Sequence, residues 1–243
     1  MPTIVIGTRR LNYTVRYSRR RTVGIKLVPP DLLEVAAPAG FPGASIEAVL
    51  LKKAAWIAGH LRRLAATAAN PINAGLQPGS QLLYLGRPLS LRIVPAKTAR
   101  PKVEQDGRQL LVHLPPAPDR AQAGLLAEAL KKWYIHAARE LLAERTAFWA
   151  GEIGVRPCRL FIREQKSRWG SCSSRGNINY NWRIVMAPPE VVDYLVVHEL
   201  CHIKVPNHSK DFWLLVGQAV PDYKRHRKWL RENGELLMRL FSP

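Results

Sequence analysis

The residues best suited to chemistry are two histidines and a glutamate in the run His198-Glu199-Leu200-Cys201-His202. Residues four apart lie on one face of an α-helix, so the imidazoles of His198 and His202 can reach a single metal ion. Glu199 is rotated by about 100° from His198, so its carboxylate can miss the ion yet approach a water bound to it. Zinc lowers the pKa of such a water, and the glutamate can move its proton to a leaving amine. The spacing therefore predicts metal-assisted hydrolysis with Glu199 as the base.

The residues around this HExxH motif favour a functional site over two surface histidines. Such a motif also arises by chance on exposed helices. Here the four preceding residues, 194–197, are nearly all apolar, which predicts a buried helix. Because unpaired polar side chains are costly on a buried helix, we expect the histidines of this motif to bind a metal ion.

A catalytic zinc ion needs a third protein ligand and an open position. His208 is the best candidate, because the Val-Pro-Asn segment before it would end the helix and turn the chain back. The metzincin pattern HExxHxxGxxH has the same gap, but Val205 stands where that pattern has glycine. His226, within a basic run, is the alternative third ligand, and Cys172 is an alternative fourth ligand that would close the site.

Several other residues are candidates for supporting roles. Asp193 is either an acceptor for a ligand imidazole or an acid in the first turn of its helix. Tyr180, Tyr223 and Arg225 are candidates for stabilising the oxyanion that develops on a substrate, and the sequence offers no choice among them. Trp169 is expected to pack in the core.

The first half of the chain is expected to be rich in β-strands. An amphipathic helix is predicted over residues 45–69, followed by an Asn/Pro/Gly-rich loop over 70–81. Two hairpins should follow, turning at residues 86–87 and 106–107. We find no internal repeat. The predicted strands, which are short, rich in β-branched residues and bounded by turn formers, are 3–7, 11–17, 22–28 and 32–38.

The second half is expected to carry the site. The patterns predict a long helix over residues 120–151, a strand over 158–163 and a hairpin with its turn at 173–177. The HExxH helix and two C-terminal helices follow, of which the first is capped by Ser209.

A proline-rich stretch at residues 115–119 is the candidate boundary between domains 1–118 and 119–243. We therefore predict an α+β fold. A catalytic half made of a helix, a small sheet, the HExxH helix and C-terminal helices follows a β-rich half with one long helix.

The charge of the chain is unusual. Lys and Arg total 37 against 18 acidic residues, for a net charge of +19, and no acid precedes Asp31. Such a field attracts polyanions, so nucleic acid is a candidate partner and Arg19, Arg20 and Arg21 are candidate contacts. An arginine-favouring, GC-rich genome and a need for solubility are the plain alternatives.

Cysteine usage and hydropathy indicate the compartment. Three cysteines without a CxxC pair argue against a disulfide framework or a cysteine zinc ribbon, and favour a reducing compartment. No apolar run is long enough to cross a bilayer, and the N-terminus lacks the order of a signal peptide. We therefore expect a cytoplasmic protein without membrane contact.

Residues 166–230 resemble the YgjP-like metallopeptidase family and, more distantly, the SprT and Spartan zinc proteases. The resemblance extends more weakly over the N-terminal half. It implies a zincin-like fold that includes both halves, one zinc ion per chain, and His208 as the third ligand. The segments that carry it are SRWGSC at 167–172, DY at 193–194, NHS at 207–209, FW at 212–213, PDY at 221–223 and AWI at 55–57.

Motif and resemblance together predict a zinc-dependent metallopeptidase that hydrolyses a protein or peptide substrate. In this hypothesis His198, His202 and His208 hold the ion and Glu199 is the general base. Two alternatives stay open: a nucleic-acid-binding module with a structural zinc, and a protease recruited to DNA by its basic surface. Glu199 favours an enzyme, because a structural site of three histidines has no use for a base.

Overall fold

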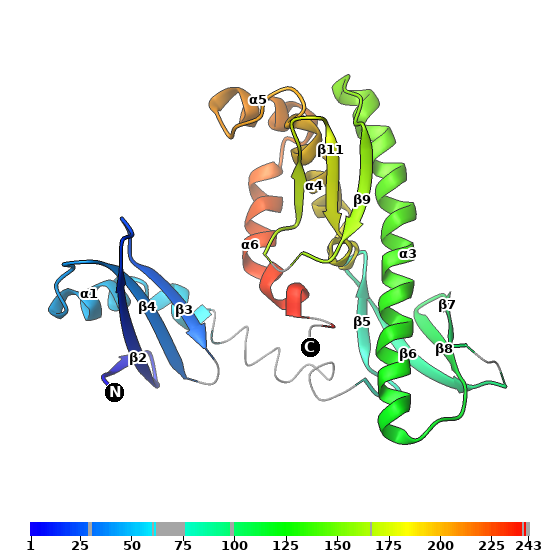
Figure 1. Ribbon diagram of the computed structural model, residues 1–243, viewed down its shortest axis with the longest axis horizontal. Helices are drawn as coiled ribbons and strands as arrows, with labels where there is room; N and C mark the ends of the chain where they lie inside the picture. Colours follow the sequence, from blue (N-terminus) through cyan, green and yellow to red (C-terminus); the bar gives the residue numbers. More distant parts are fainter. Residues whose placement is uncertain are drawn as a thin grey trace. The chain divides into compact units, whose positions relative to one another are not determined.

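The chain divides into two compact units, Met1–Asn70 and Pro71–Pro243. Each unit combines sheet and helix, which confirms the predicted α+β class (Figure 1). Among the described residues, no helix is long and apolar enough to cross a membrane. The computed structural model describes residues 1–28, 31–59, 61, 76–97, 100–165, 167–239 and 241.

In the first unit, a helix covers one face of a four-stranded sheet. The strand order is β1-β2-β4-β3, with β2 and β4 parallel and the outer pairs antiparallel. Alternate strand residues such as Leu11 and Leu33 pack on Ile46 and Leu50 of the helix, as the period-two pattern predicts. The elements are β1 (Thr3–Ile6), β2 (Arg9–Ser18), β3 (Gly24–Val28), β4 (Leu32–Pro38) and α1 (Ala44–Lys52).

The helix predicted over residues 45–69 is observed in part. After a turn at Lys53, helical residues continue over 54–59. Residues 62–69 of that prediction, and 70–75 of the loop predicted after it, lie outside the described residues.

The second unit opens with a sheet that repeats the topology of the first. Its order is β5-β6-β8-β7, again with a central parallel pair, antiparallel outer pairs and a helix after the last strand. Sequence inspection missed this repeat, because it lies in strand order and direction rather than in residue identity. The elements are β5 (Gln81–Tyr84), β6 (Arg87–Pro95), β7 (Lys102–Asp106), β8 (Gln109–Leu114) and the helix α3 (Asp119–Ile153).

The observed division of the chain differs from the boundary predicted between residues 118 and 119. Leu110 and Val112 of β8 share one core with Leu126 and Leu130 of α3. The proline-rich stretch at 115–118 is therefore a short connection inside the second unit. Burial of these leucines against the sheet makes the sheet and the helix one body.

The turn between β5 and β6 joins this sheet to the rest of the second unit. It lies at Leu85 and Gly86, one residue before the predicted position, and both residues have positive φ (49° and 73°). Their backbone N–H groups donate to the carbonyls of Val185 (2.7 Å) and Met186 (3.2 Å). A Cβ on Gly86 would come within 3.1 Å of Pro188, so the close approach also requires glycine.

The remaining elements form the predicted order of strands, HExxH helix and C-terminal helices. The three-stranded sheet has the order β10-β11-β9, in which β10 is antiparallel and β9 parallel to β11. Ser209 caps α5 as predicted, accepting a hydrogen bond from the Phe212 N–H. The elements are β9 (Arg159–Arg163), β10 (Gly170–Cys172), β11 (Asn177–Asn181), the 3-10 helix η1 (Trp182–Met186), α4 (Pro189–Cys201), α5 (Lys210–Ala219) and α6 (Tyr223–Arg239).

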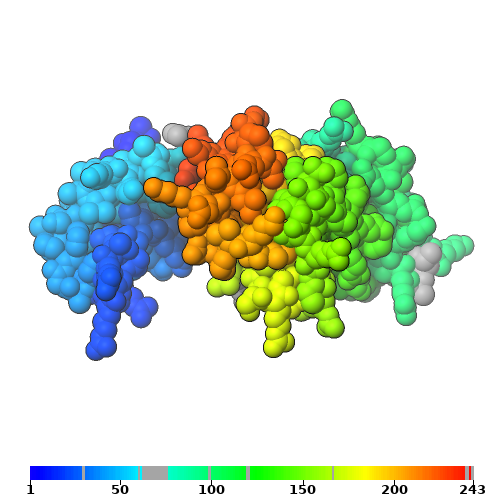
Figure 2. Space-filling view, turned by 90° about the horizontal axis from the view of Figure 1, so that it is seen from above, coloured from blue at the N-terminus to red at the C-terminus, as the bar shows by residue number. Residues whose placement is uncertain are grey.

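The HExxH helix α4 lies at the centre of the second unit. Residues 194–197 are buried, as their apolar character predicts. Arg145 of α3 donates two hydrogen bonds, of 2.6 and 2.8 Å, to the carboxylate of Asp193 on α4. The C-terminal part of α3 (green) and α5 (orange) lie side by side in Figure 2, and Trp149 and Leu215 line a pocket between them. The helix carrying the motif is thus fixed on several sides.

Candidate metal centre

The three histidines come from the end of α4 and from the turn that follows it. His198 lies in the last turn of α4, and His202 is the residue at which the helix ends. The Val205 N–H bonds back to the Cys201 carbonyl at 2.9 Å, and the chain then reverses toward α5. The reversal returns His208 to the other two histidines, as the sequence predicts.

Nitrogen atoms of the three imidazoles converge on one point. One ring nitrogen each from His198, His202 and His208 lies within 4.8 Å of the other two. The two Nε2 atoms of His198 and His208 are 3.1 Å apart. Zinc–nitrogen bonds of 2.0–2.1 Å in a tetrahedron place ligand nitrogens roughly 3.3 Å apart, so this donor set fits a zinc ion.

Contacts behind the rings hold them in this arrangement. The Nδ1 of His202 lies 3.1 Å from the Val205 carbonyl oxygen, which leaves Nε2 directed at the cluster. The His202 ring stacks on Phe212 at 4.5 Å, and the His208 ring stacks on Trp213 at 5.6 Å. The Ser209 cap therefore has a second role, because it starts the helical turn that places both aromatic rings beside the histidines.

Burial keeps His198 neutral. Its pKa falls to about 3, mainly because burial disfavours the charged form, with smaller contributions from His202, His208 and Arg227. Burial also lowers the pKa of His202. Neutral imidazole is the form that binds a metal, so the site is set up to accept an ion at neutral pH.

The carboxyl of Glu199 is buried beside the cluster. Only 4% of this residue is exposed, and burial raises its pKa to about 8. Among the described residues, none forms an ion pair or hydrogen bond with it. A carboxyl with a pKa near neutrality can both accept and return a proton, as a general base and acid must.

The edge strand β10 lies against Glu199. A Cβ on Gly170 would come within 2.5 Å of Oε1 of Glu199 and 2.8 Å of its Cγ and Cδ. Only a glycine therefore lets the β10 backbone approach the carboxyl this closely. This contact joins residues 29 positions apart, and the sequence indicated only a tight turn at Gly170, within the SRWGSC segment.

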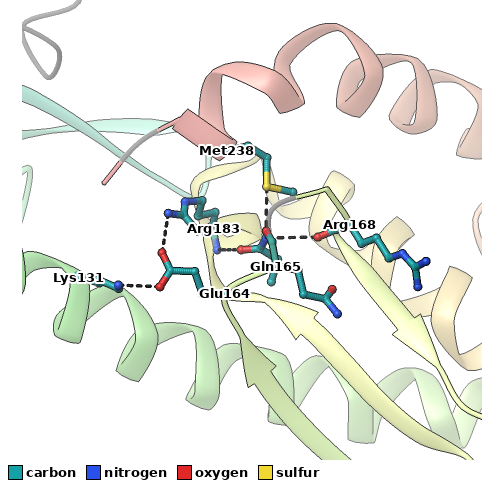
Figure 3. A network of polar contacts seen from close by, with 7 residues as sticks. Lys131, Glu164, Gln165, Arg168, Arg183 and Met238 are labelled. Carbon is teal, nitrogen blue, oxygen red and sulfur yellow. Dashed lines mark hydrogen bonds and ion pairs between the residues drawn. The ribbon is translucent and has the colours of Figure 1, made fainter. Parts of the chain in front are cut away.

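A polar network holds the segment that leads into β10. The side-chain amide of Asn181 donates to the backbone carbonyls of Gln165 (2.7 Å) and Arg168 (3.3 Å), at both ends of that segment. Nearby, Arg183 and Lys131 both contact the carboxylate of Glu164, at 2.8 and 2.6 Å (Figure 3). Burial alone would raise the pKa of Glu164, but these two cations lower it. The network fixes where β10 begins.

The supporting residues proposed from the sequence have contacts with side chains other than the three ligand imidazoles. Asp193 binds Arg145 rather than a ligand imidazole. Tyr180 is fully buried and accepts a hydrogen bond from Thr146, and burial raises the pKa of its hydroxyl. Tyr223 stacks on Trp213 at 5.2 Å. Each therefore has a packing or helix-linking partner.

The two alternative ligands also lie outside the cluster. His226 is buried and lines a pocket with Arg225 and Pro188 at the start of α4. Cys172 is half-buried, and burial together with the charge of Glu199 raises the pKa of its thiol. Of the described residues, only His198, His202 and His208 form a group of potential metal ligands.

Arg227 is a neighbour of the site that the sequence analysis missed. Its guanidinium lies 4.6 Å above the Trp213 ring, and its charge lowers the pKa of His198. Arg225, one of the three oxyanion candidates named from the sequence, lies about 200° away around the same helix. The spacing of Arg227 from Tyr223, four residues along α6, was the available signal that both share one helix face.

Comparison with known families agrees with this geometry. Residues 21–233 match the model of the YgjP-like metallopeptidase domain. The chain belongs to the YgjP-like metallopeptidase family. This match spans both units and confirms the resemblance seen in the sequence.

Comparisons with curated proteins and with solved structures add little to the family assignment. Among curated proteins, none matches the chain. Among solved structures, the chain is similar to the metallopeptidase zymogen of Pyrococcus abyssi abylysin, with 21% identity over 37% of this chain and 93% of that one. The TM-score is 0.35, so no argument about function rests on this similarity.

Proposed function

We propose that this chain is a zinc-dependent peptidase in which His198, His202 and His208 hold the ion and Glu199 is the general base. The observation that carries the proposal is the convergence of three ring nitrogens within 4.8 Å, next to a buried carboxyl whose pKa is raised to about 8. Membership of a metallopeptidase family supports the same chemistry.

The residues of the chain divide the work of hydrolysis. A zinc ion held by the histidines would supply a Lewis acid that polarises a carbonyl and makes a water more acidic. Glu199 accepts a proton as water attacks the peptide carbonyl, and then donates that proton to the leaving amine. Its burial favours the first step, because the fold stabilises the protonated carboxyl that this step forms.

The position of β10 supports a peptide as the substrate. β10 is an edge strand of its sheet, and its Gly170 lies directly against Glu199. Edge strands bind extended peptides through backbone hydrogen bonds. A peptide aligned along β10 would bring its own backbone carbonyls near the base, and this suggests recognition that depends little on side-chain identity.

The proposal is tested by a peptidase assay with controlled metal content. Metal-free protein, prepared with a chelator, should show no cleavage of an unfolded protein such as casein, and one equivalent of zinc should restore it. Magnesium should not replace zinc, because a site of three imidazoles suits zinc and not hard oxygen-seeking ions. Equal cleavage before and after chelation would mean that the activity does not arise from this site.

Gly170→Ala should lower peptide turnover without removing zinc. The added methyl group overlaps the Glu199 carboxyl, so either the base rotates or β10 shifts. Displacing a catalytic group by about 1 Å costs on the order of 100-fold in rate. Gly151→Ala on α3 is the matched control, because a Cβ there meets nothing within 4 Å. Wild-type turnover in Gly170→Ala would show that the base does not act from its observed position.

A further inference from the structure

The first unit leaves one face of its sheet uncovered by α1. Strand residues that alternate with the buried ones lie on this face, and they include Thr14, Arg16 and Lys26. A groove of about 500 Å³ crosses it, lined by residues of β2, β3 and β4 and by Arg20. We call this surface the open face. Residues that line the groove are Thr14, Arg16, Arg20, Gly24, Ile25, Lys26, Glu34, Val35 and Ala36.

The groove carries more positive than negative charge. Arg16, Arg20 and Lys26 are its cations, and Glu34 is its acid. The ammonium of Lys26 lies 3.0 Å from the Glu34 carboxylate, so that acid is already neutralised within the groove. The guanidinium groups of Arg16 and Arg20 remain as hydrogen-bond donors. A planar guanidinium can donate two parallel hydrogen bonds to phosphate oxygens, which the ammonium of a lysine does not.

Arg20 is held in the groove by a glycine. Its guanidinium lies against Gly24, so that a Cβ on Gly24 would come within 2.7 Å of one terminal nitrogen and 3.0 Å of the other. The Nε atom of Arg20 is buried and has no hydrogen-bond partner in the described parts of the chain. A buried N–H without a partner is costly, which is expected where a bound ligand satisfies it.

We propose that the open face binds the phosphodiester backbone of a nucleic acid. This proposal is independent of the peptidase activity. A protein partner needs an apolar centre to its interface, and a membrane needs apolar side chains to insert. Among the described strand residues of this face, Val5 is the large apolar side chain that is strongly exposed, and it lies on the outer strand β1. The surface therefore suits a phosphate chain better than either.

The chemistry of the face also predicts the mode of binding. The groove-lining residues include no aromatic side chain on which a base might stack. Contacts should therefore be to phosphates, with little preference for sequence and none for single strand over duplex. Of the three arginines proposed from the sequence, Arg20 lines the groove, while Arg19 and Arg21 are exposed beside it.

The test is a titration of labelled mixed-sequence DNA, duplex and single-stranded, with the full chain over a range of salt concentrations. The Arg16→Gln/Arg20→Gln double variant should weaken binding roughly tenfold near physiological salt. Its log–log salt slope should be less steep by about 1.4–1.8, since each lost phosphate contact removes about 0.7–0.9. The Lys52→Gln/Lys53→Gln variant removes the same charge from the opposite side of the unit. Its DNA affinity and salt slope should stay near the wild-type values.

The Gly24→Ala variant tests the position of the Arg20 guanidinium separately from its charge. The methyl group displaces only the flexible end of Arg20. The fold and the net charge are therefore kept, while the guanidinium group moves away from its observed position. Binding should weaken severalfold. The proposal would be overturned if the wild-type chain does not bind DNA. It would also be overturned if Gly24→Ala and the two double variants all bind DNA with the same affinity. Polyglutamate that competes with DNA at equal charge would overturn it in favour of an acidic protein partner.

Discussion

Glu199→Gln is expected to keep its zinc and to lose at least about 10²- to 10⁴-fold in peptide turnover, which is the range that general base catalysis contributes. Glutamine has the same shape, so it fits beside Gly170, but it cannot accept the proton of the attacking water. Turnover and zinc content should be measured on the same preparation. The proposed mechanism would be contradicted if the zinc-loaded variant cleaves peptides at the wild-type rate.

The same variant has a control that needs no substrate. In the metal-free fold, burial raises the pKa of Glu199 from 4.5 to about 8, so the fold prefers the protonated carboxyl. That preference stabilises the fold below pH 4.5 and is lost as the pH rises through 8. Glutamine does not ionise, so Glu199→Gln should become more stable than wild type by roughly 2–4 kcal/mol above pH 8. A difference in unfolding free energy that does not change with pH would contradict the buried position of this carboxyl.

This pair of measurements also separates the enzyme from a module with a structural zinc. A structural site would lose neither metal nor function in Glu199→Gln. The pH-dependent stability would still change, because it depends only on burial of the carboxyl. Loss of turnover together with retained zinc is therefore the result specific to catalysis.

The parts of the site that the sequence predicted are those set by neighbouring residues. The spacing of His198, Glu199 and His202 follows from helix geometry, and the Ser209 cap follows from a local hydrogen bond. The turn that returns His208 was visible in the Val-Pro-Asn segment before it. Each depends on a stretch of about ten residues, within which backbone geometry leaves few alternatives.

The parts that were missed depend on tertiary contacts. Asp193 was predicted to be either an acceptor for a ligand imidazole or an acid in the first turn of its helix, yet it pairs with Arg145, which lies 48 residues earlier on another helix. The close approach of Gly170 to Glu199 depends on how β10 packs on α4, and no local pattern specifies it. Long-range pairs of this kind depend on which faces of the helices and strands pack together. The spacing of neighbouring residues in a single sequence does not specify that packing.

The domain boundary shows the same limit. Three prolines between residues 115 and 118 resemble a linker, but the leucines on either side of them, Leu114 and Leu126, belong to one core. Hydrophobic burial across the prolines outweighs the local signal. The repeated sheet topology was hidden for a related reason, because strand order is a property of pairing between strands and not of any one strand.

His208→Ala is expected to lower zinc affinity by at least about 100-fold, since even changes to residues behind the ligands cost 10- to 100-fold. The His208 side chain is exposed, so its removal leaves no cavity and the metal-free fold should unfold at the wild-type temperature. The measurement is zinc content by elemental analysis after dialysis, with affinity from competition with a chelator.

Two matched variants make the assignment of the third ligand specific. His226→Ala removes the alternative histidine, whose ring lines a different pocket, and Cys172→Ser removes the alternative thiol. Both should keep full zinc. Full zinc in His208→Ala, or loss of zinc in His226→Ala, would place the third ligand elsewhere. Because His198 and His202 lie on one helix in either case, that result would leave the HExxH pair intact and would instead revise the turn that completes the site.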